Sequence, residues 1–189
     1  MTGSGSGPNE PAQGGLPPWA VVSPGRAEHV ARVAALLDQW AVAMQLDSLE
    51  RNRWSRAAWL HDALRNADEA VLRAMLPDND EPYPLLHGPA AAQRAAAEGE
   101  TDAAVLEAVR WHTVGCAGWA LTGRALYAAD FLEPGRPFLQ AERAELAAAW
   151  PGDPDGVLVR IVSLRTTHQA ARGRPEHPAS ATFRQSIGA

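Results

Sequence analysis

The sequence predicts an all-α fold with a single domain. Alanine is concentrated in segments such as residues 90–97 and 147–149, and runs of β-branched residues, which favour strands, are few. Apolar side chains recur at intervals of three and four residues, as on one face of a helix. The chain has 189 residues, of which 46% are hydrophobic and 21% are charged, and this is an ordinary balance for one globular core.

Both ends of the chain are expected to lie outside the folded domain. Residues 1–15 are rich in Gly, Ser and Pro, and they lack the basic start and apolar stretch of a signal peptide. We expect residues 1–20 to form a disordered tail, residues 21–172 to fold, and residues 173–189 to form a flexible tail.

Helix-start signals locate the first two helices. Ser23-Pro24 is typical of an N-cap followed by proline at the first helical position, and His29 lies one turn into that helix. The second helix is expected to begin at Asp47, where the spacing to Glu50 resembles a capping box, and to end near the His61-Asp62 doublet. The first helix has an apolar face made by Val30, Val33, Leu36, Leu37 and Trp40.

Proline and glycine delimit the later helices. A short helix over residues 68–75 should end at a proline-rich loop over 77–86, after which His87-Gly88-Pro89 opens an alanine-rich helix that ends at Gly99. Thr101 is expected to cap the following helix, which leads to His112-Thr113. Three more helices are expected over residues 119–131, with Asp130 in the last turn, 137–150 and 155–171. We assign the last two to packing, with His168 on an exposed helix face and His177 in the tail.

Charge and cysteine content exclude several classes of protein. All 17 basic residues are arginine, they are scattered, and the net charge is -5, so we expect no binding to duplex nucleic acid. Cys116 is the only cysteine, which excludes an internal disulfide and fits the reducing cytoplasm. No segment resembles a membrane span, so we expect a cytoplasmic protein without a membrane partner. A homodimer is left open.

A set of metal-binding residue types recurs along the expected helices and helix ends. Imidazole and carboxylate ligands suit divalent ions such as Fe, Mn, Co, Ni and Zn, and the absence of cysteine among them indicates a catalytic rather than a structural site. Six ligands exceed what one metal with open positions needs, but they fit two metals that share a carboxylate, for which Asp62 is the natural bridge. The alternative is a buried cluster whose members pair with one another. The residues are His29, His61, Asp62, His87, His112 and Asp130.

The motifs around these residues resemble the HD-domain phosphohydrolase superfamily, and in particular the YqeK-type bacterial symmetrical diadenosine tetraphosphate hydrolases. A His-Asp doublet is common by chance, but HGP, HTxG and AD-x-x-EPGR in this order are distinctive. Two features depart from the pattern: Val114 stands where a second threonine is common, and Trp54, Trp59, Trp111 and Trp119 surround the motifs. The matching segments are residues 26–29 with 32–33, 60–62 with 65, 87–89, 112–113 with 115, and 129–130 with 133–136.

The resemblance implies a helical HD domain over residues 21–172 with a dinuclear site between helices. It implies that His29, His61, Asp62 and Asp130 hold one metal, that Asp62, His87 and His112 hold the other, and that the metals are Fe or Mn. It also implies catalytic roles for Asp62 and Arg65, and contacts of Arg65, Thr113 and Arg136 with the phosphates of the substrate. Arg26 and Arg32 are weaker candidates for such contacts.

The expected function is metal-dependent hydrolysis of diadenosine tetraphosphate to two ADP, by attack of metal-bound hydroxide. One alternative is an HD phosphohydrolase of another nucleotide or phosphoester, because the same centre can serve several substrates. The other alternative is a non-catalytic sensor that binds a nucleotide or metal. The complete ligand set and Arg65 favour the enzyme.

Overall fold

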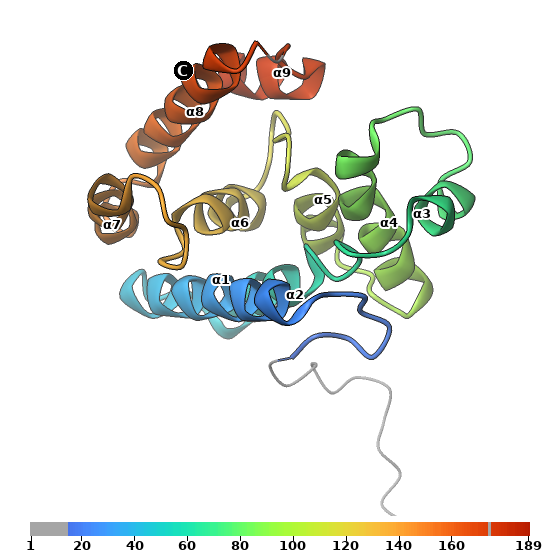
Figure 1. Cartoon of the computed structure of the whole chain (residues 1–189). Coiled ribbons are helices and arrows are strands. Elements are labelled where there is room, and N and C mark those ends of the chain that lie inside the picture. The colour runs from blue at the N-terminus through green and yellow to red at the C-terminus, as the bar shows by residue number, and fades with distance from the viewer. Residues whose placement is uncertain (1–14, 174) are drawn as a thin grey trace, which may run out of the picture.

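The computed structural model describes residues 15–173 and 175–189, whose regular secondary structure is helical throughout (Figure 1). The all-α prediction is confirmed. The tail expected over residues 1–20 falls mostly on residues 1–14, which lie outside the described part. The helices are α1 (Pro24–Ala43), α2 (Ser48–Leu60), α3 (Glu69–Met75), α4 (Tyr83–Ala97), α5 (Ala103–Trp111), α6 (Leu121–Leu132), α7 (Gln140–Ala149), α8 (Pro154–Ala171) and α9 (Pro178–Ser186).

Helices α2, α5 and α6 form the middle of the bundle and bring the ends of several helices together. Helix α1 packs on α2, α4 packs on α5, and α7 and α8 pack on the far side of α6 (Figure 1). The core is filled by large apolar side chains, among them the fully buried Trp54 and Trp150. The rings of Trp40 and Trp150 stack at 4.9 Å, and Trp40 Nε1 donates to the Ala147 carbonyl at 2.9 Å, which joins α1 to α7.

Two predicted helix starts are confirmed by their caps. The Ser23 hydroxyl accepts a hydrogen bond from the Arg26 amide, and the Asp47 carboxylate accepts one from the Glu50 amide at 2.8 Å. Glu50 does not complete a capping box. Its carboxylate instead accepts hydrogen bonds from Trp54 Nε1 at 3.0 Å and from the Thr122 hydroxyl at 2.7 Å, and so it ties α2 to α6.

Two other helix starts differ from the prediction. Helix α4 begins at Tyr83 rather than at His87, because Pro84 fits the first turn, where its missing N–H needs no partner, and the helix continues through Pro89. Helix α5 is capped by Asp102 rather than Thr101, since the Asp102 carboxylate accepts from the Ala104 amide at 3.0 Å. His87 therefore lies within a helix rather than at its start.

The C-terminal residues form a docked helix in place of the expected flexible tail. The Phe183 side chain of α9 is 1% exposed and packs edge-on against the rings of Trp119 and Tyr127, with 5.3 Å between ring centroids in each pair. Gly115 lies beneath it with φ of 89°, and a Cβ at that position would overlap the Phe183 ring. His177 caps α9 by accepting from the Ala179 amide. The division of the chain at residues 20 and 172 stays a prediction.

None of the described helices combines the length and the apolar character needed to cross a membrane.

We expect Phe183→Ala to lower the free energy of unfolding by about 3 kcal/mol, because it leaves a cavity between α9 and the core. Chemical denaturation followed by circular dichroism measures this change. Leu49→Ala is the matched control, since Leu49 is 55% exposed and its truncation should change stability by less than about 0.5 kcal/mol. Equal stability of wild type and Phe183→Ala would contradict the docking of α9.

Candidate metal centre

The bundle brings all six predicted ligands to one place. His29 comes from α1, His87 from α4 and Asp130 from the last turn of α6, whereas the His61-Asp62 doublet and His112 directly follow α2 and α5. The four histidines and Asp62 are each at most 4% exposed, and Asp130 is half-buried. They form two groups of three, in which one ligand atom per residue lies within 4.8 Å of the others.

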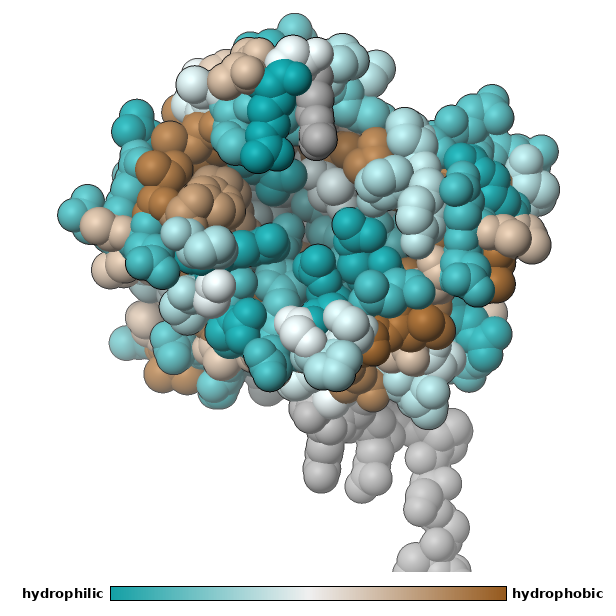
Figure 2. All heavy atoms as spheres, in the orientation of Figure 1, coloured by the Kyte–Doolittle hydropathy of each residue, from teal (hydrophilic) through white to brown (hydrophobic). Residues whose placement is uncertain are grey.

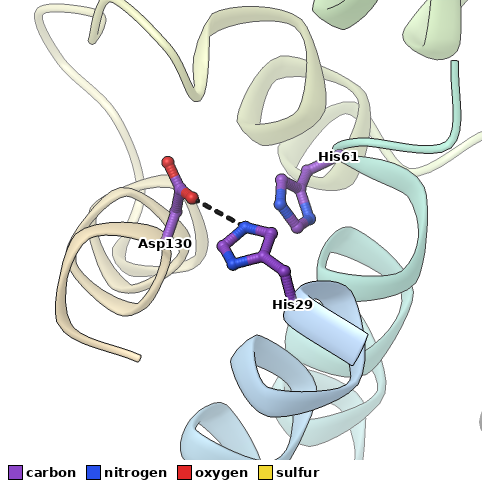
Figure 3. A group of neighbouring side chains, drawn as sticks. All are labelled: His29, His61 and Asp130. Atoms are coloured by element: carbon purple, nitrogen blue, oxygen red, sulfur yellow. Dashed lines mark ion pairs between the residues drawn. The ribbon is translucent and has the colours of Figure 1, made fainter. Parts of the chain in front are cut away.

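The first group is His29, His61 and Asp130 (Figure 3). The three side chains point toward one another from α1, the end of α2 and α6, and His29 Nε2 lies 3.0 Å from Asp130 Oδ1. The second group is Asp62, His87 and His112. In this group His87 Nε2 lies 3.0 Å and His112 Nε2 lies 3.6 Å from Asp62 Oδ1.

Asp62 faces both groups. Its Oδ1 atom points at the second group, while its Oδ2 atom lies 3.7 Å from His29 Nε2 and 3.5 Å from His61 Nε2 of the first group. A carboxylate that presents a different oxygen to each of two ligand groups has the arrangement of a bridging ligand.

Each of the four histidines makes a hydrogen bond through Nδ1, on the side of the ring away from the centre. Its Nε2 atom, which faces the centre, can therefore offer a lone pair to a metal. The Nδ1 atoms of three histidines contact the backbone carbonyl three residues earlier, and the fourth, His29 Nδ1, contacts Glu133 Oε1 at 3.1 Å. A carbonyl oxygen can only accept, so Nδ1 carries the proton and Nε2 is free to ligate a metal. The carbonyl contacts are His61 to Ala58 at 2.7 Å, His87 to Pro84 at 2.9 Å and His112 to Val109 at 2.8 Å.

The donor set fits divalent cations better than pairing within the cluster. His29 Nε2 and His61 Nε2 are buried without a hydrogen-bond partner among the described residues, which is costly for a polar atom. His87 Nε2 and His112 Nε2 lie 3.1 Å apart, so that two lone pairs face each other when both rings carry the proton on Nδ1. A cation between such nitrogens would give the buried Nε2 atoms a partner and would remove the repulsion between the facing lone pairs. The imidazole and carboxylate donors of these residues suit divalent metals.

Burial and mutual contact shift the pKa values of several candidate ligands. Burial lowers the pKa of His61 to about 4, so its imidazole is neutral near pH 7. Burial alone would raise the pKa of Asp62, but the neighbouring His61, His112 and His87 outweigh it and hold that pKa well below its usual range. The pKa of Asp130 is likewise lowered, since its contact with His29 and the charge of Arg136 outweigh burial. Burial also lowers the pKa of His87, whereas contact with Asp62 outweighs burial and raises the pKa of His112.

Glu133 orients one of the ligands and was not among the predicted site residues. Its carboxylate is 1% exposed and accepts from His29 Nδ1, from Arg32 Nε at 2.5 Å and from the Gly135 amide at 2.8 Å. It fixes the direction of the His29 ring, as carboxylates behind metal-ligating histidines do. The sequence signal was the EPGR segment, but a buried position for its glutamate does not follow from the segment alone.

The two groups of ligands open into a cavity of about 520 Å³ that is lined with arginine. Of the predicted phosphate contacts, Arg65, Thr113 and Arg136 all line it. Arg26 Nη1 donates to Asp62 Oδ2 at 2.8 Å, and Arg136 Nη2 donates to Asp130 Oδ1 at 2.8 Å, so both guanidinium groups reach the ligand carboxylates. Across the face of Figure 2, the surface in the middle is hydrophilic and is flanked by a hydrophobic patch on the side of α7 and α8.

The assignment of α8 to packing alone was wrong. Arg165 and His168 of this helix line the cavity. Arg165 Nη2 donates to the Thr113 carbonyl at 2.7 Å, and its guanidinium lies over the Tyr127 ring at 4.5 Å. The helical period alone could not reveal which face of α8 meets the site, because that face depends on how α8 packs against α6.

Comparisons with known proteins agree with this geometry. The family model of the HD domain matches residues 26–163. The chain is 26% identical over 155 residues to a symmetrical bis(5'-nucleosyl)-tetraphosphatase of Halalkalibacterium halodurans, a match that covers 76% of this chain and 80% of that protein. A crystal structure from Clostridium acetobutylicum, described as a predicted HD superfamily hydrolase involved in NAD metabolism, has a similar fold. Its TM-score is 0.76 at 22% identity, over 88% of this chain and 90% of that one.

We expect Glu133→Ala to weaken the binding of a divalent metal by about 10- to 100-fold, because the His29 ring loses its orienting partner. Titration of the metal-free protein with Mn²⁺, followed by calorimetry, measures the affinity. Glu28→Ala is a matched control, since the Glu28 side chain is 74% exposed on α1, four residues before Arg32. Unchanged affinity in Glu133→Ala would exclude an orienting role.

Proposed function

The chain belongs to the HD domain family, and from that premise we propose that it is a metal-dependent hydrolase that splits diadenosine tetraphosphate symmetrically into two ADP. The observation that carries the proposal is the position of the Asp62 carboxylate, which faces the histidines of both groups of residues beneath an arginine-lined cavity. The choice of substrate is supported by the relative that is named as a symmetrical bis(5'-nucleosyl)-tetraphosphatase.

The residues proposed as ligands are those of the two groups. His29, His61, Asp62 and Asp130 would hold one ion, and Asp62, His87 and His112 would hold the other. Iron and manganese are our proposal for the ions, since both accept imidazole and carboxylate ligands. When bound, such ions supply Lewis acidity and lower the pKa of water for attack on phosphorus.

The arginines provide the positive charge that a polyphosphate requires. Arg26, Arg65, Arg136 and Arg165 come from four different segments and line one cavity, and Arg65 follows Asp62 by three residues. Arg26 and Arg136 contact the same carboxylates that would bind metal. A cation at those carboxylates competes for the same oxygens, and the guanidinium groups are then available to phosphate oxygens.

In this proposal the chain acts by positioning and by stabilising charge. Water attacks one of the two central phosphorus atoms and loses a proton to solvent. The bond from that phosphorus to the oxygen it shares with the other central phosphorus breaks, and ADP leaves with negative charge on its terminal phosphate. Arg65 and Arg136 would stabilise the charge that develops on the phosphoryl oxygens, and the Thr113 hydroxyl would bind one of them. A nucleophilic side chain is not required.

A second cavity supports a substrate that extends beyond one nucleotide. It has a volume of about 420 Å³ and shares Leu85 and Thr113 with the arginine-lined cavity. Its lining combines the carboxylates of Asp78 and Glu81 with Arg110, and it includes Trp111, whose aromatic ring suits a nucleoside. Symmetrical cleavage requires room for one ADP on each side of the broken bond, and two adjoining cavities supply it.

Product analysis of the metal-loaded protein with diadenosine tetraphosphate tests the proposal. We expect ADP as the only product from wild type and background turnover from Asp62→Ala, because the bridging carboxylate is lost. Asp38→Ala is the control for removal of an aspartate, since the Asp38 side chain is 68% exposed on α1. AMP plus ATP would contradict symmetrical cleavage. Turnover only of other phosphoesters, or binding without turnover, would favour the alternative hydrolase or the sensor.

A further prediction concerns Arg65. We expect Arg65→Ala to lower kcat/KM by about 100- to 1000-fold, because charge on the phosphoryl oxygens is no longer stabilised, and we expect Arg65→Lys to recover part of the loss. Steady-state kinetics with the same substrate measures the change. Arg94→Ala should match wild type, since the Arg94 side chain is 47% exposed on α4. A fall of less than threefold in Arg65→Ala would remove Arg65 from the mechanism.

A further inference from the structure

One end of the arginine-lined cavity is aromatic rather than charged. Phe131 at the end of α6, Phe138 in the segment between α6 and α7, and His168 of α8 line this end. The same side of the molecule carries the hydrophobic patch of Figure 2. The cavity thus has a charged part over the metal ligands and an apolar, aromatic part beside α7 and α8.

Phe138 is unusually exposed for a large aromatic side chain. It is 45% exposed, and the adjacent Leu139, which also lines the cavity, is 49% exposed. The other strongly exposed large apolar residues of the described chain are aliphatic, and they are Val21, Val42, Leu49 and Val71. The chain turns at Leu139, whose φ of 49° is unfavourable for a residue with a Cβ, and such strained positions cluster at ligand sites. Covering the Phe138 ring with a ligand would remove apolar surface from water.

The exposed ring is nevertheless held from behind. The buried Arg143 of α7 places its guanidinium over the Phe138 ring at 5.0 Å and over the Phe131 ring at 5.5 Å. Its hydrogen bonds to the carbonyls of Phe131, Glu133 and Phe138 fix the backbone of this segment. Phe138 therefore presents a ring that is supported on the protein side and open on the cavity side.

The ring of Phe138 is almost parallel to the ring of His168. The two ring planes differ by 8° and the centroids lie 6.5 Å apart. Two nearly parallel rings at one end of the cavity offer aromatic surfaces in almost the same orientation. A planar group that stacks on one of the rings would therefore lie nearly parallel to the other.

We propose that Phe138 and His168 form a stacking site for a nucleobase at the rim of the metal cavity, an inference that rests on the proposed hydrolysis of a nucleotide. Arg165 lies three residues before His168 on α8, so one helix face presents a positive charge next to the aromatic ring. A ligand with a planar base at one end and phosphates at the other matches both features. Stacking accepts every base, so the site would favour nucleotides over bare polyphosphates without choosing strongly among bases.

Binding of ADP and of methylenediphosphonate, which keeps a diphosphate group without the nucleoside, tests the proposal by calorimetry on Mn²⁺-loaded protein. We expect Phe138→Ala and His168→Ala each to weaken ADP binding roughly fivefold or more, with methylenediphosphonate affinity unchanged. Phe138→Trp should retain ADP affinity because it restores an aromatic face. Leu49→Ala, an exposed apolar truncation on α2, should leave both affinities unchanged.

Three results would overturn the stacking site. They are unchanged ADP affinity in Phe138→Ala, an equal loss for both ligands, which would indicate damage to the phosphate site, and equal affinity of wild type for ADP and methylenediphosphonate. Because the measurement needs no turnover, a selective loss of ADP affinity would support the stacking site even if diadenosine tetraphosphate were not a substrate. Thermal unfolding of each variant verifies that the fold is intact.

Discussion

The buried Asp62 carboxylate is the constraint on which the rest of the structure depends. An ionised carboxylate is stable away from water only when opposite charges or hydrogen-bond donors surround it. Here Arg26 Nη1 donates to Asp62 Oδ2, and the imidazoles of His61, His87 and His112 converge on the same carboxylate, where a bound cation would balance its charge. Helices α1 and α4 and the C-terminal ends of α2 and α5 must therefore meet around Asp62.

Helix ends give this centre its precision. His61 and His112 directly follow α2 and α5, where each ring turns back to a carbonyl of the last helical turn and presents its other nitrogen to the centre. His87 makes the same contact from within α4, where Gly88 allows close packing: a Cβ there would lie 2.9 Å from the Arg110 carbonyl. Backbone geometry, rather than flexible side-chain packing, thus sets the direction of three of the four rings.

The parts of the fold that could be predicted from sequence were those that local chemistry determines. The caps at Ser23 and Asp47 and the six candidate metal ligands could be recognised from short-range sequence patterns. The start of α4 was missed because Pro84 suits both a loop and a first turn, and α9 was missed because Phe183 becomes buried only through Trp119 and Tyr127. Phe138 and His168 lie 30 residues apart in the sequence, and only the packing of α7 and α8 on α6 makes their rings parallel.

The Nε2 atoms of His29 and His61 have no hydrogen-bond partner in residues 15–173 and 175–189, and this links the folded state to the supply of metal. An ion that binds only the assembled cluster stabilises the native chain by mass action, by about 1.4 kcal/mol for each tenfold rise in free metal above the dissociation constant. The fraction of chains that is folded then depends on the concentration of the ion in the cell as well as on the sequence. Scarcity of the metal would reduce the amount of intact protein along with its activity, so abundance and catalysis would respond to the same variable.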